Sequence, residues 1–354
     1  MMGYEKNVRQ VVPYTPGEQP QDQKLIKLNT NENPYPPAPG VQRALRELEA
    51  DRLRLYPDFT AAKLVEAIAG YHGVSPEQVF VGVGSDDVLA MAFLTFFNGD
   101  QPILFPDITY SFYDVWAELF RIPYHTCPLD ENFRIVKEDY FCENGGIIFP
   151  NPNAPTGVLQ PLSMIEEVLK KNPDVAMILD EAYIDFGGES CLPLLTEYEN
   201  LLVVRTFSKS RSLAGLRIGY AVGNARMIQY LNAVKFSFNS YTMNDPTISL
   251  GVASIEDDAY FKSMRDALIR TREHAKKKLR ALGFSFQDSQ ANFIFATHES
   301  IPAARIFEAL KEKGIYVRYF NKPRIDNYLR ITVGTEEQME ALFAALRMII
   351  KEES

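Results

Sequence analysis

Lys209 and Asp180 are the two residues whose types and positions most clearly allow chemistry. Lys209 ends the segment Thr206-Phe207-Ser208-Lys209, which follows the apolar run Leu201 to Val204. Such a run is typical of a buried strand, so we expect the amine at the strand's carboxyl end, where open α/β sheets bind ligands. Asp180 directly follows the apolar run 177–179. Its carboxylate is therefore expected one residue past a neighbouring strand.

An amine at this position could form a Schiff base with an aldehyde. Arg217 and the Ser208 hydroxyl would suit a phosphate at the other end of that aldehyde, and pyridoxal 5'-phosphate carries both groups. Beside its pyridine ring, the Asp180 carboxylate would keep the ring nitrogen protonated and make the ring a better electron sink. Taken singly, Lys209 is better explained as a surface lysine and Asp180 as a helix cap. Their occurrence after neighbouring strands reverses that preference.

A second anion site is expected at Gly84-Ser85-Asp86. These residues follow the short predicted strand 79–81 and open a helical pattern, so free backbone N–H groups could hold a phosphate. The alternatives are a plain helix cap and a dinucleotide site. The dinucleotide site is disfavoured because Asp87 occupies the position of the third glycine.

Two more loops follow predicted strands. Tyr110 comes after the apolar run 103–105 and could stack its ring on a flat cofactor or simply pack. The loop 150–157 (Pro-Asn-Pro-Asn-Ala-Pro-Thr-Gly) follows the run 147–149. Its prolines restrict the backbone and could hold an asparagine amide in one orientation.

Arg318 and Arg330 each lie in a predicted strand with apolar alternate neighbours. Paired guanidinium groups commonly grip a carboxylate or phosphate. The alternative is two arginines that face solvent.

The elements that must position these residues predict an α/β protein. Apolar strands alternate with helical patterns, and 354 residues exceed what one core usually serves. We expect an N-terminal arm over 1–39, a large domain with a mostly parallel sheet over 40–245, and a smaller α/β domain over 246–354. A long helix is expected from Asp257 to Leu282, ending at Gly283.

Composition limits the possible partners. With 37 basic and 46 acidic residues the formal charge is −9, and no block of like charge is present, which disfavours nucleic acid and anionic membranes. No apolar run is long enough to span a bilayer, and the N-terminus lacks a signal-peptide core. Three widely separated cysteines favour free thiols and the cytoplasm. The four histidines show no ligand spacing, so no metal site is expected.

In order, these motifs resemble the fold-type I pyridoxal-phosphate-dependent aminotransferases, and among them the histidinol-phosphate aminotransferases. The likeness covers essentially the whole chain. Three segments look particularly like those enzymes: Asn31-Glu32-Asn33-Pro34, the Leu55-Tyr56-Pro57 turn, and Gly314-Ile315-Tyr316-Val317-Arg318.

The resemblance implies the roles at the cofactor ring. Lys209 would bind the cofactor covalently and carry a proton during the reaction, and Asp180 would pair with the ring nitrogen. Tyr183 and an asparagine would contact the ring oxygen. Asn153 is predicted for this contact, with Asn151 as the alternative, because Ala154 stands where many aminotransferases have asparagine.

The resemblance also implies the remaining contacts. Backbone at Gly84, Ser85 and Asp86, with Ser208 and Arg217, would hold the cofactor phosphate, while Tyr110 would stack on the ring. Tyr56 would enter the neighbouring subunit's site, which implies a homodimer. The residues expected to bind substrate are Tyr14, Asn33, Arg318 and Arg330.

The implied reaction is amino transfer between histidinol phosphate and 2-oxoglutarate. In histidine biosynthesis it would run in the opposite direction, from imidazole-acetol phosphate and glutamate. Arg330 would bind the amino donor's carboxylate. Arg330, Arg318 and Tyr14 together would bind the phosphate of histidinol phosphate. An aromatic aminotransferase and a threonine-phosphate decarboxylase share nearly all the cofactor residues and remain alternatives. A non-catalytic cofactor-binding regulator is disfavoured, because no DNA-binding helix pair or basic region accompanies the domain.

Overall fold

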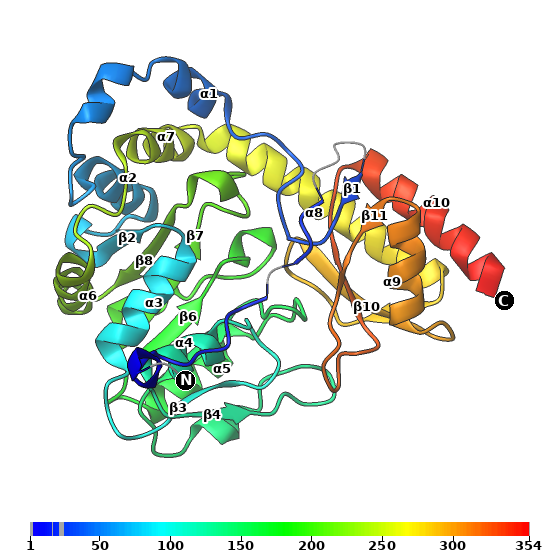
Figure 1. The fold of residues 1–354 in the computed structure, drawn as a ribbon, viewed down its shortest axis with the longest axis horizontal. Coiled ribbons are helices and arrows are strands. Elements are labelled where there is room, and N and C mark those ends of the chain that lie inside the picture. The colour runs from blue at the N-terminus through cyan, green and yellow to red at the C-terminus, as the bar shows by residue number, and fades with distance from the viewer. Residues whose placement is uncertain (1–2, 16, 21–24, 354) are drawn as a thin grey trace.

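The computed structural model describes residues 3–15, 17–20 and 25–353. Two sheets of unequal size, each with its own helices, form a large and a small domain (Figure 1). Of the predicted arm, residues 1, 2, 16 and 21–24 lie outside the described residues.

The large domain contains a seven-stranded sheet. All strands are parallel except β8, which runs antiparallel to both of its neighbours. Six of the seven strands are buried at every position, which explains their continuous apolar sequences. In spatial order the strands are β2 (Val79–Gly82), β8 (Gly219–Gly223), β7 (Leu201–Thr206), β6 (Met177–Asp180), β5 (Ile147–Pro150), β3 (Ile103–Pro106) and β4 (Tyr124–Cys127).

Helices cover both faces of this sheet. One core cluster joins the sheet to α3, α4 and α6, and another joins it to α5 on the opposite face. The helices of this part are α1 (Pro39–Arg46), α2 (Ala62–His72), α3 (Ser85–Phe96), α4 (Tyr113–Phe120), α5 (Leu162–Lys171), α6 (Ala225–Phe238) and α7 (Asp245–Glu256). Short 3-10 helices lie at Gly3–Asn7, Ala50–Arg54, Pro76–Gln78, Lys137–Tyr140, Ile184–Phe186, Leu192–Thr196 and Ala214–Leu216.

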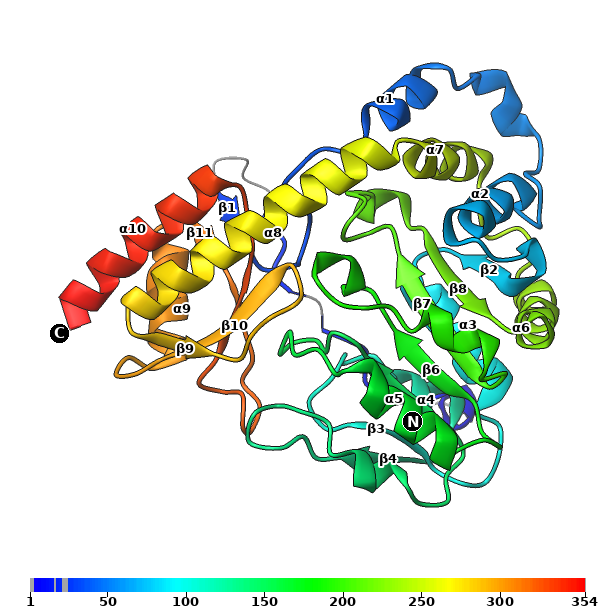
Figure 2. The same cartoon turned by 180° about the vertical axis from the view of Figure 1, so that it is seen from behind.

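The small domain has a four-stranded antiparallel sheet. Its strands, in spatial order, are β12 (Arg318–Tyr319), β13 (Leu329–Thr332), β10 (Phe293–His298) and β9 (Phe284–Phe286). Its helices are α8 (Asp258–Ala281), α9 (Ala303–Glu312) and α10 (Glu336–Glu353). Helix α8 reaches from the large domain to the small one (Figure 2).

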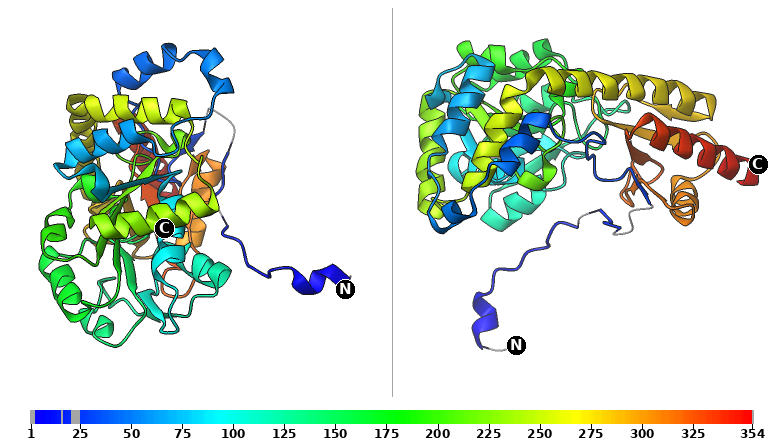
Figure 3. Two further views of the ribbon diagram at one scale, coloured as in Figure 1. Left: turned by 90° about the vertical axis from the view of Figure 1, so that its left-hand side faces the viewer. Right: turned by 90° about the horizontal axis from the view of Figure 1, so that it is seen from above.

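The arm contacts both domains. Strand β1 (Ile26–Lys27) pairs in parallel with β11 (Ile315–Tyr316) of the small domain. Tyr14 stacks on Phe112 of the large domain, with ring centroids 4.2 Å apart. The first residues of the arm project away from both domains (Figure 3).

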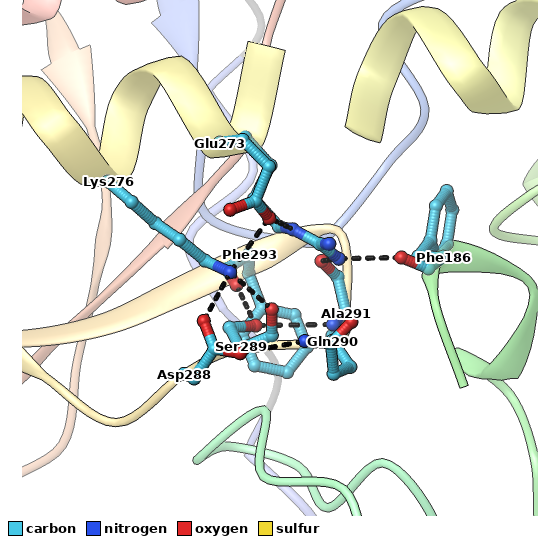
Figure 4. Close-up of polar contacts among 9 residues, drawn as sticks. Phe186, Glu273, Lys276, Asp288, Ser289, Gln290, Ala291 and Phe293 are labelled. Atoms are coloured by element: carbon cyan, nitrogen blue, oxygen red, sulfur yellow. Dashed lines mark hydrogen bonds and ion pairs between the residues drawn. The ribbon is translucent and has the colours of Figure 1, made fainter. Parts of the chain in front are cut away.

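Buried cations fix α8 at the domain junction. The Arg272 guanidinium donates to the carbonyls of Phe186, in the large domain, and Ala291, in the small one. One turn further on, Lys276 donates to Asp288 and to the Ser289 carbonyl (Figure 4). A buried carbonyl without a donor is costly, so these contacts hold the two domains in a defined relation.

The predicted α/β architecture is confirmed, with a mostly parallel sheet and a smaller domain. The long helix ends at Ala281, and Gly283 follows its last turn at φ +81°, in the left-handed conformation expected there. The domain limits stay predictions. Helix α7 packs against α1 and α2 of the large domain, whereas most of the small-domain core comes from residues 275–349. Among the described residues, no helix combines the length and apolar character needed to cross a membrane.

Candidate active site

Lys209 and Asp180 lie at the same edge of the large sheet. Asp180 is the last residue of β6, which pairs in parallel with β7, and Lys209 follows the end of β7 by three residues. The Lys209 amine is half-buried, 3.4 Å from the Thr30 carbonyl and 5.8 Å from the centre of the Tyr183 ring. The predicted nucleophile therefore faces the arm and the residue predicted to contact the cofactor's ring oxygen.

The Asp180 carboxylate is buried with neutral partners. Tyr113 donates to its Oδ2 at 3.2 Å and the Ala182 N–H to its Oδ1 at 3.1 Å. Burial raises the pKa of Asp180 to about 6, although both hydrogen bonds oppose the shift. Within the described chain, no lysine, arginine or histidine forms an ion pair with it. A cationic N–H from a bound ring would supply the missing charge.

The residues predicted to bind the cofactor phosphate lie together at the start of α3. Arg217 donates to Asp86 at 3.0 Å and lies 3.4 Å from the Ser208 hydroxyl. Gly84 precedes the helix at φ +87°, and a Cβ there would collide with the Arg217 guanidinium. The first N–H groups of a helix have no intrahelical partner, so α3 at Ser85, the hydroxyl and the guanidinium form one anion-binding corner.

Tyr110 and Tyr113 connect this corner to the acid. The Tyr110 hydroxyl donates to Asp86 at 2.7 Å, and burial, with the Asp86 charge, raises the pKa of Tyr110 well above its usual value. The rings of Tyr110 and Tyr113 meet edge to face at 5.8 Å. Tyr113 was not predicted as a site residue. Its position three residues after Tyr110, at the start of α4, is the signal that could have found it.

The two asparagines of the 150–157 loop differ in their free hydrogen-bonding capacity. Asn151 uses both ends of its amide on the backbone of Gln160. Asn153 donates to Ile108 and Thr156, but its Oδ1 is buried without a partner in the described chain. Asn153 is therefore the better candidate to bind a ligand. The contact of Asn153 with the ring oxygen stays a prediction.

The arm contributes two asparagines. The Asn33 amide donates to the carbonyls of Lys209 and Ser210 at 3.0 and 3.2 Å, so it holds the lysine loop directly. Its predicted substrate contact stays a prediction. Asn31, which was not assigned a role, donates to the Tyr183 hydroxyl at 2.9 Å.

Arg318 and Arg330 occupy directly opposed positions on β12 and β13. Arg330 donates to the Asn29 carbonyl at 2.9 Å, while its Nε is buried without a partner in the described part of the chain. Burial, together with the Arg318 charge, lowers the pKa of Arg330. Like charges at opposed positions destabilise a sheet. An anion bound between the two guanidinium groups would therefore reduce their repulsion.

A cavity of about 740 Å³ opens beside Arg318. Tyr14 from the arm, Thr109 and Arg318 all line it. The Thr109 hydroxyl is buried without a partner among the residues described. The predicted substrate residues Tyr14 and Arg318 therefore share one cavity.

Tyr56 lies apart from this group. Its side chain is 83% exposed, and its ring packs at 4.8 Å on Tyr241. Among the described residues no contact joins its side chain to Lys209, and its place in a neighbouring subunit's site stays a prediction.

These features fit pyridoxal phosphate. The anion corner at Gly84, Ser208 and Arg217 suits the phosphate. Asp180, which has no ion-pair partner in the described chain, suits a protonated ring nitrogen, and the buried Asn153 oxygen without a partner there suits a further polar group. Lys209 supplies the amine that would bind the aldehyde.

Comparison with known proteins gives a consistent result. Residues 23–346 match the model of the family "Aminotransferase class I and II". The chain is 54% identical over 347 residues to "Histidinol-phosphate aminotransferase 2" of Dechloromonas aromatica, covering 97% of each chain. It is 52% identical over 353 residues to "Histidinol-phosphate aminotransferase" of Acinetobacter baylyi, covering 99% of this chain and 98% of the relative.

A solved structure shows the same fold. Histidinol-phosphate aminotransferase from Sinorhizobium meliloti, in complex with pyridoxal-5'-phosphate, superposes with a TM-score of 0.83 at 23% identity, covering 93% of this chain and 92% of that one. The predicted fold-type I architecture is thereby confirmed.

The buried Asp180 predicts a pH-dependent stability of the cofactor-free protein. Because the pKa of Asp180 is about 6 in the folded protein and 3.8 for an ordinary aspartate, the unfolded state loses its proton first as the pH rises. Ionisation therefore costs the folded apoprotein up to about 3 kcal/mol above pH 6 and little below pH 4. In urea unfolding, Asp180→Asn should stabilise the apoprotein at pH 7 by a fraction of this amount, and less at pH 4.5.

The control is Asp174→Asn, which changes an exposed aspartate just before β6. It should leave the free energy of unfolding nearly unchanged at both pH values. Equal effects of Asp180→Asn at the two pH values would contradict the assigned cost.

Proposed function

The chain belongs to the class I and II aminotransferase family, and we propose that it transfers an amino group between histidinol phosphate and 2-oxoglutarate in histidine biosynthesis. The relatives that are about half identical over nearly the full length carry that name, which confirms the prediction of a histidinol-phosphate aminotransferase. Pyridoxal phosphate is the cofactor of this reaction. Its protonated ring withdraws electrons from the carbon that bears the substrate's amino group.

The single structural observation that carries the proposal is the opposed pair Arg318 and Arg330. Arg330 interacts electrostatically with Tyr183, and the Lys209 amine lies 5.8 Å from the centre of the same ring. Both half-reactions bring an anion to this place: glutamate and 2-oxoglutarate bring a carboxylate, and histidinol phosphate brings a phosphate. Two guanidinium groups at directly opposed strand positions can bind either group.

The chain's own residues have separable tasks. The Lys209 amine would accept a proton from the substrate carbon and deliver it to the cofactor's former aldehyde carbon. Asp180 would hold the proton on the ring nitrogen, since a carboxylate buried without a cation has a strong preference for a cationic partner. Asn33 fixes the backbone of Lys209 and so limits where the amine can reach.

The substrate assignment is tested by comparing rates on three amino compounds. Purified protein with pyridoxal phosphate should transaminate histidinol phosphate far faster than phenylalanine, and only when 2-oxoglutarate is present. Fastest turnover of phenylalanine would instead identify an aromatic aminotransferase. Release of carbon dioxide from threonine phosphate without 2-oxoglutarate would identify the decarboxylase.

Arg318→Ala should damage one half-reaction more than the other. A lost charge-assisted contact costs about 1.5–3 kcal/mol, so kcat/KM for histidinol phosphate should fall roughly 10- to 100-fold. The value for glutamate should change much less, because Arg330 remains. Lys322→Ala, at the rim of the same cavity, is the control, and equal losses for both substrates would remove the phosphate assignment.

We also propose that the protein is a homodimer. Four aromatic residues pack against one another on the large domain and remain between 37% and 83% exposed: Tyr56, Phe59, Phe236 and Tyr241. Aromatic groups of this kind are typical of interfaces. The arm adds exposed Val8, Val11 and Val12. The cytoplasmic location expected from the three free cysteines remains part of the proposal.

Mixing two defective subunits tests whether Tyr56 serves its partner. Lys209→Ala and Tyr56→Ala proteins should each have low activity alone. After subunit exchange, half of the dimers are mixed and one of their two sites carries neither substitution, so about a quarter of the wild-type activity should return. No recovery in a mixture shown by native mass spectrometry to contain mixed dimers would place Tyr56 outside the partner's site.

A further inference from the structure

Asn31 is a buried polar residue to which the reaction assigns no task. It lies in the arm, where only 1% of its surface is exposed. Its backbone is left-handed, with φ +57°, a conformation that asparagine tolerates better than most residues do. A buried amide in an uncommon backbone conformation needs specific partners to be stable.

Every polar atom of Asn31 has a partner. Its N–H donates to the Thr332 hydroxyl at 3.0 Å, and its carbonyl accepts from the Asn292 amide at 3.0 Å. Its side-chain Oδ1 accepts from the Thr332 hydroxyl at 3.1 Å, and its Nδ2 donates to the Tyr183 hydroxyl at 2.9 Å. The residue therefore connects the arm, the small-domain residues Thr332 and Asn292, and Tyr183 of the large domain.

The network decides which end of the amide faces Tyr183. The Thr332 hydroxyl already accepts from the Asn31 N–H, so its single hydrogen is available to donate to Asn31 Oδ1. Nδ2 then points to Tyr183, and the amide orientation follows from this network. Because the phenol oxygen accepts this hydrogen bond, its own hydrogen is left for a different acceptor.

We propose that Asn31 is a positioning residue which makes Tyr183 a hydrogen-bond donor to the cofactor's ring oxygen and ties that role to the small domain through Thr332. The proposal rests on the proposed function. Thr332 ends β13, the strand that carries Arg330, so the strand that binds substrate also holds the amide that orients the tyrosine.

The other groups around Tyr183 come from different elements. Lys209 lies 5.8 Å from its ring. Arg330 of β13, Tyr110 and Tyr113 interact with it electrostatically. Asn31 is neutral, so its effect on the cofactor should act through the Tyr183 hydrogen bond and not through charge.

The proposed hydrogen bond should change the pKa of the bound cofactor, which can be measured. The chromophore formed when pyridoxal phosphate binds Lys209 changes its visible absorbance as it loses a proton. Its deprotonated form carries more negative charge on the ring oxygen, so a hydroxyl that donates to this oxygen favours that form and lowers the chromophore's pKa. Loss of the oriented donor should raise it.

The test is a spectroscopic pH titration of the holoenzyme. Asn31→Gly retains the left-handed backbone and removes only the side chain. The pKa of the chromophore should rise by roughly 0.5 to 1 unit, the equivalent of one hydrogen bond. In a Tyr183→Phe background, the same substitution should cause no further rise.

A second variant guards against poor folding of the first. Asn31→Asp has nearly the same shape but cannot donate, so Tyr183 would turn its hydrogen to the new carboxylate. The rise in pKa should be larger with Tyr183 present than in the Tyr183→Phe background. Equal rises in both backgrounds would mean that the carboxylate acts by charge alone, and would overturn the proposal.

The control is Asn29→Ala, in the same arm. The Asn29 amide donates to the Glu18 carbonyl at 2.7 Å and does not contact Tyr183, so the chromophore's pKa should be unchanged. A protein that develops no visible absorbance with pyridoxal phosphate would contradict the proposed function. A normal absorbance whose pKa is insensitive to Asn31 would contradict this inference alone.

Discussion

The Asp180 carboxylate is buried at the end of a parallel strand with no ion-pair partner among the described residues, and the site is arranged around this constraint. Tyr113 and one backbone N–H supply only neutral donors. The apoprotein therefore carries a charge that it can lose only by binding a proton. A protonated pyridine nitrogen removes the cost, so the same feature that destabilises the empty fold favours cofactor binding.

The other site residues lie around this acid because parallel strands deliver their following loops to one edge of a sheet. Strands β5, β6 and β7 bring the asparagine loop, Asp180 and Lys209 to that edge. The antiparallel β8 pairs with β7 and β2, and a Cβ on its first residue, Gly219, would collide with the backbone of Gly84 and Ser85. This close approach places Arg217 beside the start of α3. The arm and the small domain then cover the edge from the other side.

Much of this could be predicted from the sequence, for reasons that are local. An apolar run followed by a polar residue identifies the strands that end in Asp180 and Lys209, and a helix stop is readable at Gly283. Tyr113 and Asn31 were missed because their partners lie 67 and 152 positions away, and no local pattern reports such contacts. Strand β8 was missed because its glycines, Gly219 and Gly223, resemble a loop. The difference between Asn151 and Asn153 appears only once the backbone of Gln160 is placed.

The central claim is that one amine, that of Lys209, receives the cofactor at the edge that holds Asp180. Its most direct test is to reduce the holoenzyme with borohydride, digest it, and identify the modified peptide by mass spectrometry. The pyridoxyl group should be found on Lys209, and a Lys209→Ala protein of normal fold should give no labelled peptide. A label on another lysine, such as the buried Lys235, or retention of the label after the substitution, would contradict it.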